Sequence, residues 1–321
     1  MRRELFDLLT CPVCLDSHLI GVDLASGGHE LACSRCDARY AVRNDIPILL
    51  PPGFDAADVH DEIDHMHGHA GHKHQQADYF DRGVAEEFEI SRPNGAPETY
   101  RWLLSEKFRR SIAGLPDLRG AAVVDVCCGS GMDAEMLARA GARVIAIDIS
   151  EGCAARAMER AKRYGLDYLV VVGDVEHLPI ATASADVSYV HDGLHHLTYP
   201  AAGLRELARV ARRAISINEP AEALGTAVAV KFGLALERED AGNRVARLRP
   251  DAVARELARA GFDARAERYL MYYKHEPGAA MEFASRPVVR DVYRGVVTAA
   301  DRALGRWGNK LQVTATRRRA A

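Results

Sequence analysis

The sequence lacks any apolar stretch long enough to cross a membrane. Its longest apolar region, residues 214–236, is interrupted by Glu219, Glu222 and Lys231, whereas a membrane-spanning helix needs about 20 consecutive apolar residues. Residues 1–10 also lack the apolar core of a secretory signal, because acidic residues interrupt them. We therefore expect a cytoplasmic protein without a membrane span, in which cysteine thiols stay reduced.

An excess of basic charge is also missing. The 42 Lys and Arg residues stand against 45 Asp and Glu residues, and the formal net charge is −3. The dense basic cluster at residues 317–319 is interpreted as a solvated tail. Proteins that bind phosphate backbones usually carry a basic surplus, so we do not expect nucleic acid as a partner.

The remaining composition is that of a globular protein. The chain has 321 residues, of which 48% are hydrophobic and 27% charged, enough for two domains with a substantial core. Three zones differ in pattern. Residues 1–54 are turn-rich and contain paired cysteines, residues 55–76 are acidic and rich in histidine, and residues 77–321 alternate strand-like and helix-like segments. That alternation predicts an α/β fold with a doubly wound parallel sheet.

Cysteine is concentrated in the first zone. Cys11 and Cys14 form one CxxC pair, and Cys33 and Cys36 form a second. Two such turns predict a four-thiolate Zn²⁺ site, because each turn places two sulfurs on one side and soft thiolates suit zinc. A closed set of four ligands leaves no open position, so the zinc would be structural. It would supply folding energy to a unit whose core is too small to be secure alone.

This first zone resembles the small zinc-binding activator proteins that partner tRNA and translation-factor methyltransferases. The resemblance is carried by residues 9–14, 33–36 and 40–50. It implies that residues 1–54 serve as a scaffold or docking unit and take no part in catalysis.

The second zone is interpreted as a flexible, solvated linker, since residues 55–76 show no apolar periodicity. Clustered histidines can bind metal, so metal binding by this linker remains an alternative. The histidines concerned are His60, His65, His67, His69, His72 and His74.

The third zone yields a series of predicted elements. Buried apolar runs predict strands, and apolar residues at helical spacing predict helices between them. The expected strands are 121–126, 143–148, 169–172, 186–190, 214–218, 264–272 and 311–316. The expected helices are 132–140, 151–164, 201–210 and 251–260, and glycines follow three of them.

A glycine-containing loop follows the first predicted strand. Gly129 and Gly131 allow the backbone to approach a ligand closely at the start of a helix. The second predicted strand ends at Asp148, whose carboxylate can accept hydrogen bonds from both hydroxyls of a ribose. Asp174 follows the third predicted strand, where a carboxylate can accept a hydrogen bond from the amine of an adenine.

Together with Asp125, these features resemble class I S-adenosylmethionine-dependent methyltransferases over about residues 120–220. The resemblance continues through residues 186–197 and 204–210, and it is to the branch that acts largely on small molecules and lipids. It implies a seven-stranded Rossmann-like sheet with a reversed last strand. The implied cofactor-binding residues are Tyr79, Asp125, Gly129, Gly131, Asp148, Ile149, Asp174, Val175 and His191.

Each of these residues has an implied position. Asp125 and the two glycines would surround the methionine portion of the cofactor. Asp148 and Ile149 would hold the ribose and adenine, Asp174 and Val175 would bind adenine, and His191 would approach the cofactor. Tyr79 lies in a segment that resembles one closing over the cofactor. The sequence departs from the family at Cys127, where a glycine is usual, and a side chain there would narrow the loop.

Methyl transfer to a hydroxyl needs a group that removes the proton, typically a histidine. His195 and His196 follow the fourth predicted strand, at the edge where open parallel sheets hold their ligands. We expect one of them to be this base, although a packing or loop role remains open for each. Residues 276–304 would form either a substrate lid or a homodimer contact, and residues 219–249 a second wall.

The leading hypothesis from these features is that the protein is an O-methyltransferase for a small-molecule or glycan acceptor. An RNA or protein methyltransferase, with the first zone gripping its substrate, is the main alternative. The charge balance disfavours it, as does the absence of an Asn/Asp-Pro-Pro-Tyr motif after Val190. A nicotinamide-dependent dehydrogenase would explain the glycine loop but not Asp125 and Asp174. A binding protein without catalytic activity would also keep the fold.

Overall fold

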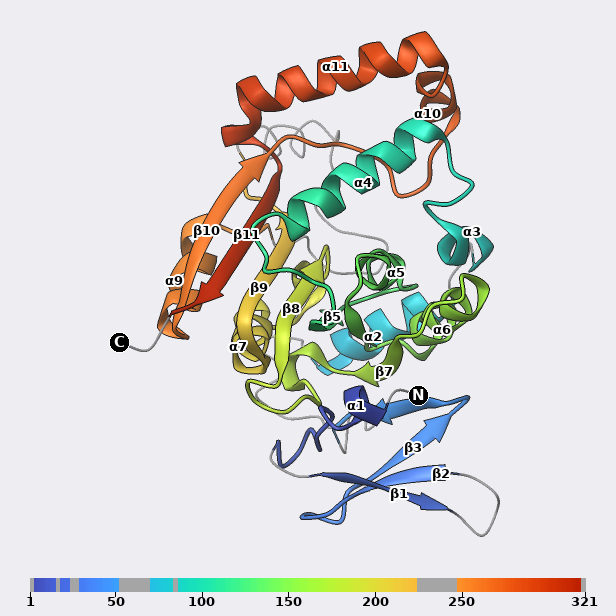
Figure 1. The fold of residues 1–321 in the computed structure, drawn as a ribbon, viewed down its shortest axis with the longest axis vertical. Coiled ribbons are helices and arrows are strands. Elements are labelled where there is room, and N and C mark those ends of the chain that lie inside the picture. Colours follow the sequence, from blue (N-terminus) through green and yellow to red (C-terminus); the bar gives the residue numbers. More distant parts are fainter. Residues whose placement is uncertain are drawn as a thin grey trace.

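The computed structural model describes residues 3–15, 18–23, 29–51, 70–82, 86–223 and 247–318. Its described strands form one 11-stranded sheet in the order β1-β2-β3-β4-β7-β6-β5-β8-β9-β11-β10. Figure 1 shows this sheet running from the N-terminal strands at the bottom to β10 and β11 at the left.

The predicted methyltransferase sheet makes up the larger part. Strands β5 to β9 run parallel, and β11 is antiparallel to both β9 and β10. This arrangement confirms the expected seven strands with a reversed last strand. The central strands are buried on both faces, which explains their continuous apolar runs. The seven strands are β5 (Ala122–Val126), β6 (Arg143–Asp148), β7 (Leu169–Gly173), β8 (Ala185–His191), β9 (Ala211–Pro220), β10 (Phe262–Tyr269) and β11 (Lys310–Arg317).

Helices cover both faces of the sheet, as a doubly wound fold requires. Leu137 and Ala157 from α5 and α6 pack on one face. Leu207 and Leu257 from α7 and α9 pack on the other. The four helices are α5 (Met132–Arg139), α6 (Glu151–Arg163), α7 (Pro200–Val210) and α9 (Pro250–Arg259).

The N-terminal strands extend this sheet. Strand β4 pairs in parallel with β7, through Ile48 with Val172 and Leu49 with Gly173. Apolar residues of the first zone, among them Leu5 and Leu9, share one core cluster with the strands and helices of the α7 side. The first zone is therefore packed into the core of the larger unit. Its elements are α1 (Arg3–Phe6), β1 (Leu19–Asp23), β2 (His29–Cys33), β3 (Arg39–Arg43) and β4 (Ile46–Leu49).

Three described helices lie between β4 and β5, and the sequence predicted the bounds of none of them. They are α2 (Ala70–Asp81), α3 (Glu86–Ser91) and α4 (Glu98–Ile112). An amphipathic helix against the sheet was one interpretation of residues 79–81, which lie in the first of the three. Residues 70–76, which the sequence assigned to the linker, are the first part of α2. The apolar periodicity was absent because α2 is held largely by polar contacts, such as those of Lys73 and Asp81. His60, His65, His67 and His69, and most of the proposed wall at 219–249, lie outside the described residues.

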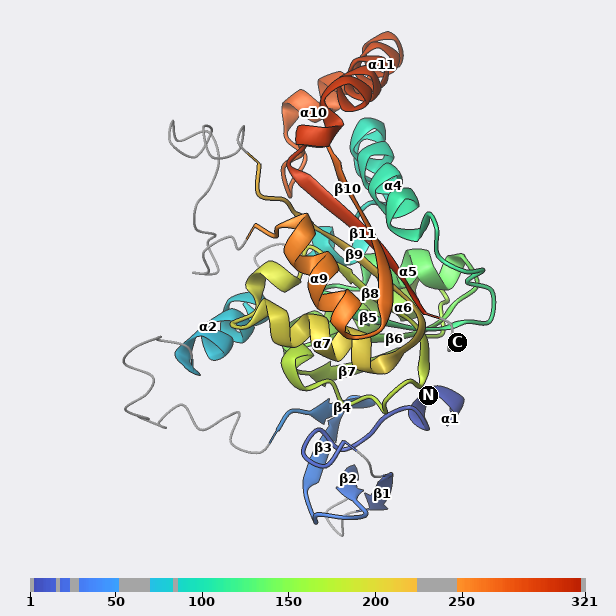
Figure 2. The ribbon, with the colours of Figure 1, turned by 90° about the vertical axis from the view of Figure 1, so that its left-hand side faces the viewer.

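Two further helices lie between β10 and β11. They are α10 (Ala279–Ala284) and α11 (Pro287–Leu304). Ion pairs join α11 to α4: Arg290 and Arg294 bind Glu98, and Asp301 binds Arg110. Figures 1 and 2 show α11 at one end of the molecule, outside α4. None of the described helices combines the length and the apolar character needed to span a bilayer.

Candidate functional site

The carboxyl ends of β5, β6, β7 and β8 meet at one edge of the sheet. Between β5 and α5 the chain makes a tight loop in which Cys127, Gly129 and Gly131 have left-handed backbone angles, with φ of 52°, 53° and 78°. Space around Gly129 is open, since a Cβ added there would meet no atom within 4 Å. This loop can therefore approach a ligand, as the sequence predicted.

Gly131 has a packing role as well. A Cβ added to it would lie 2.9 Å from the hydroxyl oxygen of Tyr168 and 3.0 Å from the Cβ of Ala157. The glycine lets the start of α5 approach α6 closely. A larger residue would push the loop away from the edge of the sheet.

Asp148 fastens the glycine loop to the end of β6. Its Oδ2 accepts a hydrogen bond from the backbone N–H of Gly129 at 2.8 Å, and its Oδ1 accepts one from Ser150 at 3.0 Å. Burial raises the pKa of Asp148, although these backbone N–H groups oppose the rise. Ile149 follows as a half-buried residue. Asp148 therefore lies beside the loop, where the resemblance places the ribose.

Asp125 carries a buried oxygen that lacks a partner. The residue is 1% exposed, and its Oδ2 has no hydrogen-bond partner among the described residues. Burial, and then the charges of Asp133 and Asp148, raises its pKa well above the ordinary value. An unsatisfied buried polar atom costs about 1–3 kcal/mol. A ligand donor at this position would remove the cost, so Asp125 and the loop fit the methionine end of S-adenosylmethionine.

Cys127 is accommodated by Gly193, in the loop after β8. A Cβ on Gly193 would lie 2.3 Å from the Cβ of Cys127 and 2.8 Å from its Sγ. The cysteine side chain thus occupies the space left by the missing side chain of Gly193. Burial, and then nearby carboxylates, raises the pKa of the Cys127 thiol well above its ordinary value, which keeps it neutral.

Asp174, expected beside the adenine, is bound by α2. Lys73 Nζ lies 2.6 Å from its Oδ2 and 2.9 Å from Glu176 Oε2, and the backbone N–H of Glu176 donates to its Oδ1 at 2.9 Å. Burial would raise the pKa of Asp174, but the hydrogen bond from His177 and the Lys73 ammonium lower it. Val175 is buried in the core at 3% exposure. Helix α2 therefore covers the predicted adenine position.

Helix α2 is fixed to α6 at its other end. Asp81 Oδ1 accepts hydrogen bonds from Ser150 Oγ at 2.6 Å and from the backbone N–H of Gly152 at 2.8 Å. Arg156 donates to the carbonyl oxygen of Phe80 at 2.6 Å. Tyr79 is 43% exposed and packs edge-on against Phe80. The segment predicted to close over the cofactor thus lies across this edge of the sheet.

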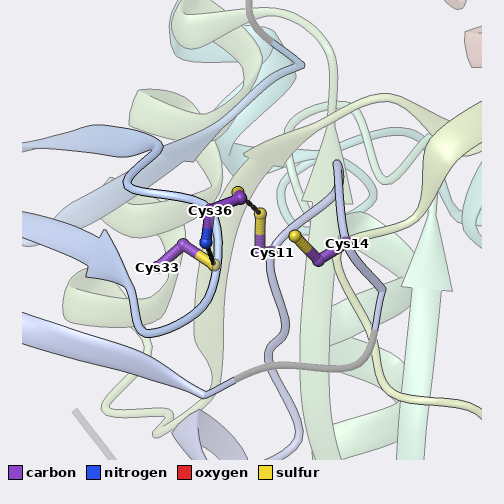
Figure 3. Close-up of side chains that lie close together, drawn as sticks. All are labelled: Cys11, Cys14, Cys33 and Cys36. Carbon is purple, nitrogen blue, oxygen red and sulfur yellow. Dashed lines mark hydrogen bonds between the residues drawn. The ribbon is translucent and has the colours of Figure 1, made fainter.

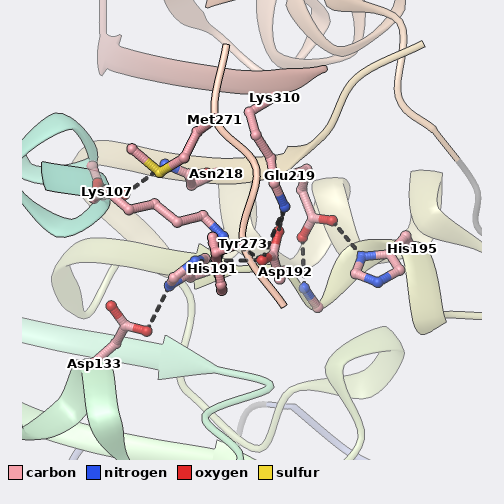
Figure 4. A network of polar contacts seen from close by, with 12 residues as sticks. Lys107, Asp133, His191, Asp192, His195, Asn218, Glu219, Met271, Tyr273 and Lys310 are labelled. Atoms are coloured by element: carbon pink, nitrogen blue, oxygen red, sulfur yellow. Dashed lines mark hydrogen bonds and ion pairs between the residues drawn. The ribbon is translucent and has the colours of Figure 1, made fainter. Parts of the chain in front are cut away.

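His195 pairs with the carboxylate of Glu219, which the sequence assigned to a wall and to a possible polar contact near the substrate. Its Nδ1 lies 2.8 Å from Oε2 of Glu219 at the end of β9 (Figure 4), and Glu219 is fully buried. The other carboxylate oxygen accepts hydrogen bonds from the backbone N–H groups of Gly193 and Leu194, both at 2.7 Å. Glu219 therefore fixes both the loop and the orientation of the His195 ring.

His196 contacts helix α2. Its Nδ1 lies 3.1 Å from Gln76 Oε1 on α2, and its ring packs edge-on against Phe80 at 5.5 Å. The rings of His195 and His196 are 4.2 Å apart. The two histidines predicted as candidate bases therefore lie together but differ in their polar partners.

His191 lies at the end of β8 and binds Asp133 of α5. Its Nδ1 is 2.7 Å from Asp133 Oδ2. Its Nε2 is buried, lacks a hydrogen-bond partner among the described residues, and lies 3.5 Å from Asp192 Oδ2. Burial would lower the pKa of His191, but the Asp133 carboxylate raises it above the ordinary value. His191 thus joins the glycine-loop side of the site to Asp192.

A charged cluster beside His191 was missed by the sequence analysis. It consists of Lys107, Asp192, Tyr273 and Lys310 (Figure 4). Lys107 of α4 is fully buried and binds both Asp192 and the Tyr273 hydroxyl, the latter at 3.0 Å. Lys310 Nζ lies 3.0 and 3.2 Å from the two Asp192 oxygens.

Asp192 is the centre of this cluster. Its backbone is left-handed, with φ of 50°, a conformation that costs energy for a residue other than glycine. Burial would raise its pKa, but the Lys107 and Lys310 ammonium groups hold it well below the ordinary value. Its side chain is 28% exposed. Asp192 is therefore an ionised, partly accessible group at the carboxyl end of β8.

The four N-terminal cysteines come together as predicted. Their sulfur atoms all lie within 4.8 Å of one another, and Figure 3 shows the four side chains gathered together. Cys11 Sγ and Cys36 Sγ are 3.7 Å apart, and tetrahedral zinc with Zn–S bonds near 2.3 Å separates its sulfurs by about 3.8 Å. The backbone N–H groups of Arg35 and Cys36 point at Cys33 Sγ, at 3.3 and 3.4 Å. The set fits a tetrahedral zinc ion.

The chain before this cluster is hydrogen-bonded to the larger unit. The backbone N–H of Thr10 donates to the carbonyl oxygen of Pro179 at 3.0 Å, and the N–H of Ala181 donates to Leu8 at 2.9 Å. Cys11 follows directly and is fully buried. The cysteine cluster is thus attached to the sheet on both sides, here and through β4.

Comparisons with known proteins agree with this geometry. Residues 124–214 match the methyltransferase domain family. A demethylmenaquinone methyltransferase of Paenarthrobacter aurescens is 33% identical over 116 residues, which cover 36% of this chain and 42% of the relative. An uncharacterised chloroplastic methyltransferase of Arabidopsis thaliana is 26% identical over 217 residues, or 64% of this chain and 59% of the relative. The chain thus spans less than two thirds of either relative.

A solved structure shows the same fold. Magnesium protoporphyrin IX methyltransferase of Synechocystis PCC 6803, with bound S-adenosylhomocysteine, aligns at a TM-score of 0.53 and 21% identity. The alignment covers 75% of this chain and 98% of that one. The family match and the shared fold agree with the predicted class: residues 124–214 match a methyltransferase domain, and the chain has the fold of such enzymes. They give no support to the nicotinamide alternative.

Proposed function

We propose that this protein transfers a methyl group from S-adenosylmethionine to a hydroxyl of a small-molecule or glycan acceptor. The observation that carries the cofactor half is the unpaired, buried oxygen of Asp125 beside the open glycine loop. The bound cofactor would supply an electrophilic methyl group. Asp125 and the loop would hold its amino acid end, and Asp148 with Ile149 would hold the ribose.

The adenine end would meet helix α2. Asp174 is already paired with Lys73 there, so an adenine amine would share this carboxylate with Lys73 or displace it. Tyr79 and Phe80 lie on the same helix, and α2 is joined to α6 through Asp81. We infer that α2 moves slightly or exchanges the Lys73 contact when the cofactor binds.

The hydroxyl half of the proposal rests on His195 and Glu219. The buried carboxylate lies next to Nδ1 of the imidazole, which favours a proton on Nδ1 and leaves Nε2 as the accepting nitrogen. A carboxylate behind a histidine also stabilises the imidazolium that forms when the proton arrives. His195 would take the proton of the acceptor hydroxyl as the oxygen–methyl bond forms.

The acceptor class is supported by the relatives and by the cluster around Asp192. Demethylmenaquinone and magnesium protoporphyrin IX, which the names of two matched proteins contain, are both small molecules. On the acceptor side, Lys310, Tyr273 and Asp192 offer hydrogen-bonding groups of both kinds. Such a wall suits an acceptor that carries oxygen substituents.

The four cysteines would hold a structural Zn²⁺. Their sulfur separations and the closed set of four thiolates carry this part of the proposal. In this position the metal would brace the segments that join the first zone to β7 and to residues 179–181.

Two measurements test the proposal. Calorimetric titration with S-adenosylhomocysteine should show binding, and Asp148→Ala should weaken it about tenfold to hundredfold because ribose contacts and the loop anchor are lost together. Asp148→Asn, which keeps one accepting oxygen, should lie in between. Stabilisation by NADH and not by S-adenosylhomocysteine would refute the cofactor assignment.

The acceptor class is tested by labelling. The protein is incubated with methyl-labelled S-adenosylmethionine and a fractionated cell extract, and label should appear in the small-molecule or glycan fraction. Label that appears only in RNA or protein would establish the alternative, in which the first zone grips a macromolecular substrate.

A further inference from the structure

Helix α11 exposes apolar side chains on its outer side. None of its 18 residues is buried, and Val288, Val292 and Val296 are 77%, 61% and 62% exposed. At about 100° per residue, these three valines together with Ala299 and Ala303 fall within an arc of about 80°. They form one continuous strip, which we call the valine strip.

The inward side of α11 combines apolar and charged residues: Tyr293 packs against the cluster of Leu103 and Met271, and ion pairs join this side to α4. Arg290 and Arg294 bind Glu98 of α4, at 2.8 and 3.2 Å, and Asp301 binds Arg110 at 2.6 Å. A surface helix normally places its apolar stripe against the core and its charges in water. Helix α11 carries apolar side chains on its outer side as well, and this valine strip lies on the outermost helix of this end of the molecule (Figure 2).

An exposed aromatic ring stands at each end of the strip, and an arginine covers each ring. Phe283, at the end of α10, is 54% exposed with the Arg286 guanidinium 5.1 Å from its centroid. Trp307, beyond the end of α11, is 54% exposed with Arg306 at 3.6 Å. Aromatic rings and arginine side chains at the two ends of an apolar surface are typical of the water–lipid interface.

The charges around the strip are mainly basic. Arg286, Arg302 and Arg306 form no ion pair with any other residue that the structure describes, whereas the exposed Asp291 is bound by Arg290 at 2.9 Å. Asp301, next to Arg302 in sequence, is bound by Arg110 of α4, and Glu282 of α10 lies four positions before Arg286. The surface therefore complements a negatively charged partner.

We propose that α11 and the end of α10 dock on the surface of a lipid bilayer that contains anionic phospholipids. The helix would lie in the plane of the interface, with the valine strip below the headgroups and the arginines among them. No spanning helix is needed for this peripheral contact. The proposal concerns a surface separate from the candidate active site and does not rest on methyl transfer.

A second copy of the chain fits this surface less well. The strip is about 24 Å long and about 10 Å wide, on the order of 240 Å², whereas a standard interface buries about 800 Å² per partner. In a two-fold contact of antiparallel helices, Arg286 of each copy would also face the Arg302 and Arg306 end of the other. Like charges would meet at both ends.

Vesicle sedimentation tests the proposal with the full-length, zinc-loaded protein. We expect it to sediment with vesicles of equal phosphatidylcholine and phosphatidylglycerol at low ionic strength. Binding to pure phosphatidylcholine should be at least about tenfold weaker, and added salt should weaken the first interaction. Failure to sediment with the anionic vesicles would overturn the proposal.

Variants of the valine strip distinguish specific docking on lipid from nonspecific adsorption of the protein to vesicles. The triple variant Val288→Ser, Val292→Ser, Val296→Ser should bind anionic vesicles at least about tenfold more weakly, because the apolar contact is lost. Ile20→Ser changes a residue of similar exposure on β1, at 54%, and should bind like the wild type. Circular dichroism and affinity for S-adenosylhomocysteine check that the triple variant is folded.

Two results would exclude a lipid bilayer as the partner of the valine strip. Equal vesicle binding by the wild type and the triple variant would show that the strip is not the contact. A wild-type dimer in analytical ultracentrifugation that the triple variant abolishes would assign the strip to a second copy.

Discussion

The carboxylate of Glu219 lies 2.8 Å from Nδ1 of His195 while its other oxygen holds the backbone of the same loop. The pair joins the end of β9 to the turn after β8 at one edge of the sheet. Because Glu219 is fully buried, water could not take over its hydrogen bonds unless the loop rearranged. This contact fixes the orientation of the His195 ring.

We predict that Glu219→Gln lowers turnover by about tenfold to hundredfold and leaves the affinity for S-adenosylhomocysteine unchanged. The glutamine can still accept hydrogen bonds from the loop, but it no longer stabilises the imidazolium that general base catalysis forms. The measurement is kcat with the identified acceptor, with calorimetry as the control for cofactor binding. His195→Asn should lower kcat further, and His196→Asn should lower it less. Equal losses for both histidines would contradict this assignment.

Asp192 should make the stability of the folded protein depend on pH in the acidic range. Its pKa in the folded state lies well below the ordinary value, because Lys107 and Lys310 favour the charged form. The ion pairs therefore stabilise the fold fully above about pH 4, the pKa of an unfolded Asp, and this contribution is lost as pH falls through the folded pKa.

We predict that Asp192→Asn lowers the melting temperature at pH 7 and that the difference from wild type shrinks as pH falls below about 4. At neutral pH the variant leaves the fully buried Lys107 without its carboxylate. Asp263→Asn, an exposed carboxylate paired with Arg318, is the matched control and should change little. A melting difference that stays constant from neutral to acid pH would refute the role of the ion pairs.

Much of the sheet could be predicted because its signals are local. Strands such as β5 and β7 are buried along their whole length and so appear as unbroken apolar runs. The helix stops predicted at Gly165 and Gly261 are confirmed, and both residues adopt a left-handed φ, of 61° and 86°. The glycine loop and the paired cysteines are equally local patterns.

The missed features depend on contacts between distant residues. Lys73 reaches Asp174 across 101 positions, and Lys107 reaches Asp192 across 85. Both lysines lie on helices that the apolar pattern did not reveal, because polar contacts hold α2 and because α4 buries a lysine. Glu219 was recognised in the sequence as a residue near the predicted site, but no sequence pattern indicated that it pairs with His195.

Removing zinc should destabilise the methyltransferase domain as well as the first zone. Cys11 and Leu9 belong to the same core cluster as Val171 and Ile180, so disorder in the cysteine cluster would expose apolar surface of the larger unit. We predict that Cys14→Ser loses about one zinc per chain and lowers the melting temperature of the whole protein. Metal analysis and calorimetric melting measure the two effects.

The control for this prediction is Cys153→Ala, which removes a buried cysteine outside the cluster and should keep the zinc. Two separate melting transitions in the zinc-free variant, with the upper one unchanged, would show that the two units are energetically independent. The absence of zinc from the purified wild-type protein would refute the metal site itself.

Gly193 and Cys127 should behave as a coupled pair. A Cβ at position 193 would come within 2.3 Å of the Cys127 Cβ, a distance at which atoms overlap, so the loop that carries His195 or the loop that carries Gly129 must move. We predict that Gly193→Ala lowers both the melting temperature and the affinity for S-adenosylhomocysteine. The double variant Cys127→Gly, Gly193→Ala should recover part of both losses, because the glycine at 127 returns the space.

The coupling is measured as a double-mutant cycle. For side chains in direct contact the interaction free energy is about 0.5–3 kcal/mol, and here its sign should favour the double variant. Cys127→Gly alone leaves a small gap beside Gly193 and relieves a left-handed cysteine with φ of 52°, so these opposing effects should nearly cancel. Strictly additive effects of the two substitutions would show that the two loops adjust independently and that Gly193 is not what accommodates Cys127.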